Sequence, residues 1–132
     1  NPDLWMLSLD GSSPPVPLLD SRFHETAGMV SPDGKWLAYC SNESEQREVY
    51  VRPFPSGDGK WQISTSGGSF PWWTKGGKEI VYLSRAREMV SVPIDFSGGV
   101  RPGRGSVLFR LPRDPTHVEV SPDGERFATT SR

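Results

Sequence analysis

A nine-residue stretch, Ser31–Tyr39 (SPDGKWLAY), occurs three times in this chain of 132 residues. It returns almost intact at Ser121–Thr129 (SPDGERFAT) and in altered form at Thr74–Tyr82 (TKGGKEIVY). The corresponding turn glycines lie 43 and 47 residues apart. A period in the forties leaves room for four short strands and their turns, so the repeat predicts a chain built from small, similar sheets.

The composition favours short strands. Glycine and proline contribute 14 and 13 residues, and they are spread along the whole chain, which disfavours helices. Apolar residues, including five tryptophans, fall in short runs between the turns. We therefore expect an all-β fold. The net charge of −1, with dispersed Lys and Arg, argues against nucleic acid as a partner, and the longest apolar run, Trp36–Cys40, is too short to cross a membrane.

A second repeat marker is independent of the turn. Residues 3–9, 48–54 and 88–94 each open on an acidic residue, carry a large apolar residue two places on, and close on another. Many strands are also apolar on both faces, which is expected when each sheet is covered on both sides, as in the blades of a β-propeller. With the strands of one four-stranded antiparallel blade called A to D, the pattern predicts a half blade (C, D) at 1–20 and complete blades at 21–65 and 66–112. A second half blade (A, B) is expected at 113–132.

The predicted strands add up to about three blades, whereas propellers close with four to eight. The chain is therefore expected to be a segment of a longer propeller, or to pair head to tail with a second copy in a six-bladed homodimer. The complementary half blades favour the homodimer. In the repeated turns, Asp33-Gly34 predicts a two-residue type I′ hairpin. Asp33 and Asp123 are expected to bond local backbone N–H groups there, and not to bind a metal.

The stretch at 31–39 and the SPDG at 121–124 strongly resemble the S-P-D-G-[KR]-x-[IL]-A-[FY] core of TolB-like repeats, the WD-repeat-like propellers of bacteria. Residues 41–54 resemble the version fused to bacterial Ser/Thr kinases. The resemblance covers essentially the whole chain and implies a six-bladed ring. The repeat at 74–77 departs from the pattern because it keeps the glycine and loses the Asp. The resemblance implies a role as a protein-binding platform, a sensor or a cap that gates a peptidase, and it is the sole indication of a periplasmic or extracytoplasmic location.

Nothing in the sequence predicts catalysis. There is no G-x-S-x-G elbow and no pairing of a nucleophile with a base, so we expect no enzyme activity and no cofactor. The single cysteine, Cys40, is expected to be a small buried hydrophobe. Glu43, Glu45 and Glu48 are expected to form a solvated acidic turn.

Candidate binding residues fall on the expected A strands and on loops. His24 and His117 lie near the start of A strands, where they could face a central channel together with Glu25 and Glu119. No ligand spacing supports a metal, and a surface or hydrogen-bonded histidine is the interpretation we favour. Trp72 points opposite to its neighbour Trp73, toward the channel or the next blade. Arg85 is a further loop candidate.

The sequence thus predicts a non-enzymatic propeller scaffold that binds a protein or ligand, with self-association by blade completion between chains. The alternative is a regulatory, sensor or gating propeller of a larger enzyme, such as a kinase or a prolyl-oligopeptidase-type peptidase. In either case the loops and the channel mouth are the expected contact surface.

Overall fold

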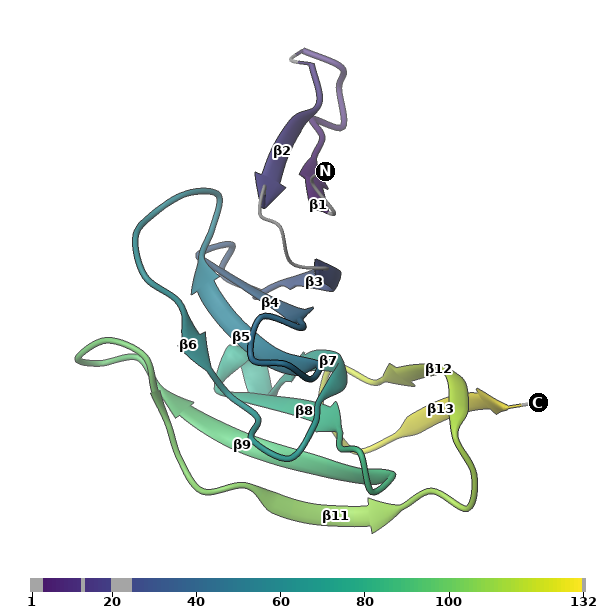
Figure 1. The fold of residues 1–132 in the computed structure, drawn as a ribbon. Helices are drawn as coiled ribbons and strands as arrows, with labels where there is room; N and C mark the ends of the chain where they lie inside the picture. The colour runs from purple at the N-terminus through teal and green to yellow at the C-terminus, as the bar shows by residue number, and fades with distance from the viewer. Residues whose placement is uncertain (1–3, 13, 20–24, 132) are drawn as a thin grey trace.

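The computed structural model describes residues 4–12, 14–19 and 25–131 (Figure 1). In this part of the chain the strands are all antiparallel, and a single 3-10 turn, η1, is the only helical element. The elements are β1 (Leu4–Met6), β2 (Val16–Leu19), β3 (Glu25–Val30), β4 (Trp36–Ser41), β5 (Glu48–Pro53), β6 (Trp61–Gln62), β7 (Ser69–Thr74), η1 (Lys75–Gly77), β8 (Glu79–Leu83), β9 (Glu88–Asp95), β10 (Arg101–Pro102), β11 (Ser106–Arg110), β12 (Pro115–Val120) and β13 (Phe127–Ser131). The predicted all-β, antiparallel fold is confirmed.

The strands form four sheets. Two are hairpins, β1–β2 and β12–β13, one near each end of the chain. The third sheet has the order β3-β4-β5-β6, and in the fourth β7, β8 and β9 pair in sequence while both β10 and β11 pair with β9. The β1–β2 hairpin lies beside β3 and stands apart from the larger sheets, and the β12–β13 hairpin lies on the far side of β7 (Figure 1). The division into blades and half blades stays a prediction.

The core lies between the sheets. One apolar cluster joins the third sheet to the fourth, with Ala38 and Val49 on one side and Ile80 and Val92 on the other. A second cluster joins the opposite face of the fourth sheet to the C-terminal hairpin. Successive residues of β8 enter different clusters, because side chains alternate between the faces of a strand. β8 is therefore covered on both faces, which explains why it lacks a polar side, whereas β11 at the edge of the same sheet is exposed.

The repeated SPDG turns differ from the expected geometry. Gly34 donates its N–H to the carbonyl of Ser31 over 2.9 Å, so the turn is centred on Pro32 and Asp33. Gly34 has φ +76°, whereas Asp33 is not among the residues with positive φ. The type I′ prediction is wrong, because proline fixes φ near −65° and a type I′ turn needs positive φ at both central residues.

The side chain of Asp33 does what the sequence predicts. Its Oδ1 accepts hydrogen bonds from the Ser31 hydroxyl at 2.5 Å and from the Lys35 N–H at 3.0 Å. These bonds, with the Ser31 hydroxyl as the larger cause, lower the pKa of Asp33. Asp123 makes the same two contacts with Ser121 and Glu125, and its pKa is lowered in the same way.

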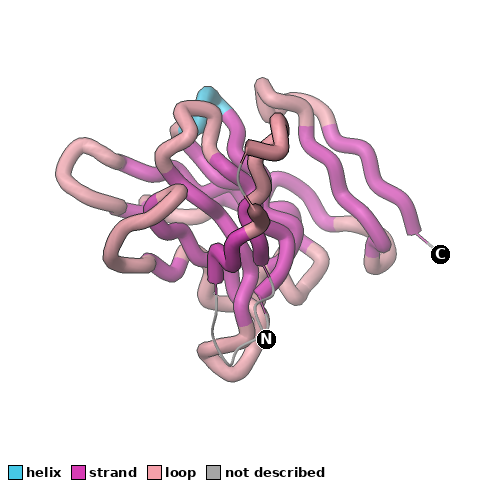
Figure 2. The backbone as a smooth tube through the Cα atoms, turned by 90° about the horizontal axis from the view of Figure 1, so that it is seen from above, coloured by secondary structure: helices cyan, strands magenta, loops and turns pink. Residues whose placement is uncertain are grey.

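The altered repeat makes a turn of opposite handedness. Lys75, Gly76 and Gly77 have φ values of +54°, +66° and +91°, all in the left-handed region. Glycine adopts this region at little cost, which accounts for the Gly-Gly pair. Replacement of Pro-Asp by Lys-Gly is thus accompanied by a different backbone path, visible from above as the short helical turn in Figure 2.

Candidate binding site on the first strands

The first strands of three successive repeats, β3, β7 and β12, lie side by side, with β7 in the middle. Each has a register irregularity near its start. The irregularities fall between Thr26 and Met29, between Ser69 and Trp72, and between Pro115 and His117. Bulges bend a strand and re-aim its side chains, and they are frequent beside functional sites. The three bulges thus fall near corresponding positions, close to the start of each first strand.

Next to these bulges the three strands line a half-open cavity of about 280 Å³, which we call the first-strand cavity. Its lining is mainly apolar and aromatic, with one imidazole: Gly28, Met29, Phe70, Pro71, Trp72, His117 and Val118. Phe70 has φ +49°, a left-handed conformation that costs a non-glycine residue about 1 kcal/mol. The ring of Phe70 meets that of His117 edge to face, with centroids 6.5 Å apart. Backbone strain at a bulge thus places an aromatic ring against the imidazole.

Trp72 and Trp73 point to opposite sides of β7, as strand alternation predicts. The indole N–H of Trp72 donates a hydrogen bond to the carbonyl of Val118 in β12 over 3.0 Å, and that of Trp73 donates to Met29 in β3 over 2.9 Å. Trp73 is buried, while Trp72 is half-buried and forms part of the cavity lining. Of the two, Trp72 is therefore the one with a surface open to a ligand.

His117 and Glu119 stand together on β12. Their Nε2 and Oε1 atoms are 3.6 Å apart, and 59% and 64% of their side-chain surfaces are exposed. An exposed pair of this kind contributes little to stability. Because both side chains are more than half exposed, an incoming molecule can reach them. His117 lines the cavity, and Glu119 adds a carboxylate beside it.

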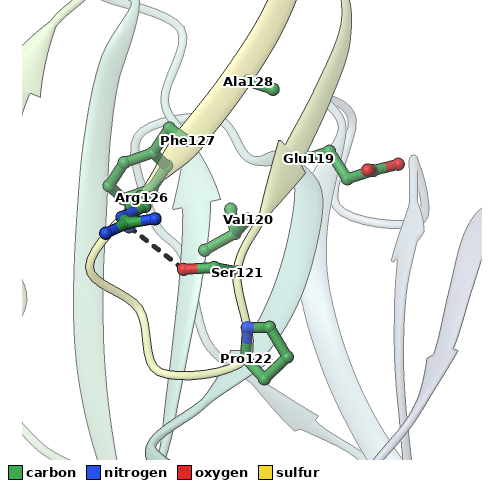
Figure 3. A pocket seen from close by; sticks show the side chains of 7 residues that line it. All are labelled: Glu119, Val120, Ser121, Pro122, Arg126, Phe127 and Ala128. Atoms are coloured by element: carbon green, nitrogen blue, oxygen red, sulfur yellow. Dashed lines mark hydrogen bonds between the residues drawn. The ribbon is translucent and has the colours of Figure 1, made fainter.

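The other predicted site residues are not gathered here. Arg85 lies in the β8–β9 turn and lines a separate hollow of about 150 Å³ with Arg47 and Gly67. Glu25 opens β3, where its backbone is opposite Ser41. His24 lies outside the described residues. The structure thus brings Trp72 and His117 together at one cavity, places Glu119 beside His117 at the edge of a different hollow (Figure 3), and leaves Arg85 elsewhere.

Glu48 is a polar residue whose environment the sequence did not indicate. The expectation of a solvated acidic turn is wrong for this residue, because Glu48 is fully buried. Its carboxylate accepts hydrogen bonds from the Ser64 hydroxyl at 2.5 Å, the Gln46 amide at 2.7 Å and the Gly67 N–H at 3.3 Å. Glu43 is also largely covered, with 13% of its side chain exposed, and forms an ion pair with Lys60, whereas Glu45 is exposed. A buried carboxylate with three donors fixes the loop that leads into β7. The one sequence signal for this buried site was the acidic residue that recurs at the start of each third strand.

The described residues contain no group of three or more His, Cys, Asp or Glu side chains arranged to hold a metal ion. No helix in the described part of the chain is long and apolar enough to cross a membrane.

Antiparallel sheets packed face to face, with their first strands adjacent, are the arrangement found between neighbouring blades of a β-propeller. Comparison with solved structures agrees: the chain has a TolB-like propeller fold. The crystal structure of TolB from Acinetobacter baumannii matches 97% of this chain with a TM-score of 0.51 and 18% sequence identity. The chain spans 42% of the length of that TolB structure. Protein-family models and curated proteins give no match.

Proposed function

We propose that this chain is a non-enzymatic propeller scaffold that binds a protein or ligand segment at the first-strand cavity. The observation that carries the proposal is the convergence of Phe70, Trp72 and His117 from two adjacent strands on one cavity. Ligand sites are typically concave and apolar, with few polar groups for orientation. A scaffold of paired strands holds such groups more rigidly than a loop does.

The size of the cavity limits its occupant. A volume of about 280 Å³ lies at the lower end of small-molecule sites, so it suits one apolar or aromatic side chain, or a ligand of that size. The aromatic rings of Phe70 and Trp72 supply apolar contact area. The exposed pair His117 and Glu119 supplies a donor and an acceptor for the polar backbone that accompanies such a side chain.

The test is a titration with N-acetyl-phenylalaninamide and N-acetyl-leucinamide, followed by NMR shifts of backbone amides. Shifts should cluster at Gly28, Phe70 and His117 and should weaken several-fold in Trp72→Ala. The matched control is Arg85→Ala, in the separate hollow, which should bind as the unaltered chain does. Shifts centred on Arg85, or none at all, would show that the cavity is not the binding site.

We further propose that the four-stranded sheet β3–β6 and the five-stranded sheet β7–β11 are complete blades, with β10 and β11 sharing the place of the fourth strand, and that the two hairpins are half blades. Support comes from the sequential pairing of the first three strands in both sheets and from the bulge in the first strand of each.

A second candidate function is a regulatory or gating propeller of a larger enzyme. It is favoured by residues 41–54, which resemble kinase-fused propellers and form the β4–β5 connection and β5. Sequencing the gene on both sides of this segment distinguishes the two: a kinase or hydrolase domain in the same reading frame supports the enzyme subunit, and its absence supports the scaffold.

A further inference from the structure

A second cavity, of about 380 Å³, lies where the third sheet meets the fourth, and we call it the outer cavity. Its lining comes from the connection after β6, from β8 and β9 with the turn between them, and from the connection between β10 and β11. None of the described residues that line it belongs to a first strand, so it shares no side chain with the first-strand cavity.

The walls of the outer cavity are partly apolar and partly polar. Ile63, Val90 and Val92 belong to the apolar cluster between the two sheets and also line this cavity. Thr65 and Ser66, both exposed, add hydroxyl groups. A molecule with a short apolar body and a polar end therefore has a matching surface for each part.

Tyr82 in β8 lines the outer cavity and is 7% exposed. Its hydroxyl makes no hydrogen bond with any other described residue, although buried hydroxyl groups normally find a partner. Burial raises the pKa of Tyr82, and the charges of Glu48 and Glu88 raise it further. The phenol therefore stays neutral at neutral pH, and its oxygen is available as an acceptor.

Glu88 is the one charged side chain in the described lining of the outer cavity, and it is half-buried. Among the described residues, none forms a hydrogen bond or an ion pair with its carboxylate. The nearby arginines are directed elsewhere: Arg87 donates to the carbonyl of Pro112 over 3.2 Å, and Arg85 lines the separate hollow. Arg110 is opposite Glu88 in the β9–β11 pairing, but these two described residues form no ion pair. The carboxylate is thus left to interact with an incoming cation.

The equivalent acid of the preceding sheet shows what such a carboxylate requires. Glu48 and Glu88 each open the third strand of their sheet, and Glu48 accepts three hydrogen bonds, one of them from the Gln46 amide at 2.7 Å. Ala86 occupies the position of Gln46, two residues before Glu88, and lines the outer cavity. The methyl group of Ala86 donates no hydrogen bond and leaves open the space that a longer side chain would fill. Donors that the chain supplies to Glu48 are therefore left to a ligand at Glu88.

We propose that the outer cavity binds the protonated amino group of a small organic amine, with the carboxylate of Glu88 as its anionic partner and the hydroxyl of Tyr82 as a second acceptor. An ammonium group has three donors and no acceptor, which suits a carboxylate and a phenol oxygen. The alkyl chain of the amine packs on Val90 and Val92. The volume is at the lower end of small-molecule sites and is far larger than a bare metal ion needs. This inference is independent of the proposed function, because the two cavities share no residue.

The test is a titration of the whole chain with n-butylammonium chloride, followed by NMR shifts of backbone amides. Saturable shifts are expected at Ser66, Tyr82 and Glu88, whereas 1-butanol, the uncharged molecule of the same size, should bind about ten-fold more weakly. Nα-acetyl-lysine N-methylamide, titrated in parallel, separates the two sources of such a group. Tighter binding of this derivative identifies a lysine side chain, and tighter binding of butylammonium identifies a free amine. The absence of saturable shifts at these residues, or equal binding of 1-butanol, would overturn the proposal.

Three variants assign the binding to the named groups. Glu88→Gln should weaken butylammonium binding about ten-fold, and Tyr82→Phe, which removes only the hydroxyl, about five-fold. Ala86→Gln should also weaken it about ten-fold, because its amide supplies the donor that Gln46 gives to Glu48. The matched control is Glu79→Gln, the same change at a half-buried position of the same sheet outside the outer cavity, which should bind as the unaltered chain does. Unchanged binding in Glu88→Gln, or an equal loss in Glu79→Gln, would contradict the site.

Discussion

The indole N–H of Trp73 donates a hydrogen bond to the main-chain carbonyl of Met29 over 2.9 Å, which joins the fourth sheet to the first strand of the third. The next residue back, Trp72, makes the corresponding bond to Val118 on the other side. Two adjacent tryptophans thus hold β7 between its neighbours. Because both indoles bond to main-chain carbonyls of the neighbouring strands, these two hydrogen bonds set the spacing of the strands that line the first-strand cavity.

Trp73→Phe should lower the free energy of unfolding by about 2 kcal/mol, because it removes one buried hydrogen bond and part of a buried ring. Trp72→Phe should cost less, about 1 kcal/mol, since Trp72 is only half-buried. Urea unfolding at a single protein concentration measures both. Equal losses for the two variants would mean that burial of Trp73 is not what holds the sheets together.

Glu48→Ala should cost about 3 kcal/mol, because it leaves the donors of Ser64, Gln46 and Gly67 without an acceptor in a buried site. Glu48→Gln should cost less, because its amide oxygen still accepts hydrogen bonds. A loss should remain, because its NH₂ group faces a donor where the carboxylate had an acceptor. Urea unfolding of both variants supplies the comparison. If the alanine variant were as stable as the original, the loop would be held by other contacts.

Stability should fall below about pH 4, where aspartates of the unfolded chain become protonated. The pKa of Asp10 is lowered to about 2, chiefly by the Ser8 hydroxyl, and those of Asp33 and Asp123 are also lowered by serine hydroxyls. A lowered pKa in the folded state contributes stability above the unfolded pKa and loses it as pH falls through the folded one. Urea unfolding from pH 5 to pH 2 should show this slope. The double variant Asp33→Asn with Asp123→Asn should be flatter than either single variant, and an unchanged slope would exclude these turns as its source.

Cys40 should resist thiol reagents in the folded protein. The side chain is buried, and desolvation raises the pKa of its thiol to about 11, so little thiolate is present at neutral pH. Modification by an aromatic disulfide reagent, followed by absorbance, should be slow without denaturant and fast in urea. Rapid modification of the native protein would show that the strand opens locally.

Lys75→Pro restores the residue of the other two repeats and should nevertheless destabilise the chain by more than about 1 kcal/mol, because Lys75 has φ +54° and proline requires a negative φ. Lys75→Gly is the matched control, since it loses the same charge and suits the left-handed backbone. Thermal unfolding compares them. A stable proline variant would mean that the turn readily adopts the geometry of its neighbours.

Part of the candidate site was predictable. Strand alternation placed Trp72 and Trp73 on opposite sides of β7, and the repeat placed His117 on a first strand. Phe70 was missed because its side chain joins the cavity through a bulge and a positive φ, neither of which hydrophobic periodicity reveals. The prediction of a type I′ turn at SPDG was wrong. Pro32, the residue before Asp33, restricts the backbone to negative φ, and this restriction outweighs the preference of Asp-Gly for a type I′ hairpin.

The sequence alone determined the all-β antiparallel fold and the turns in which an aspartate accepts local hydrogen bonds. Both depend on residues close together in the chain. These are a glycine that tolerates positive φ, a short carboxylate near backbone N–H groups, and apolar runs of strand length. Only the tertiary structure decided that Glu48 is buried while Glu45, three residues earlier, is exposed. It also decided that Trp72, Phe70 and His117 share one cavity and Arg85 another. Those outcomes depend on which sheet covers which face and on small register shifts, and such long-range packing leaves no local pattern in the sequence.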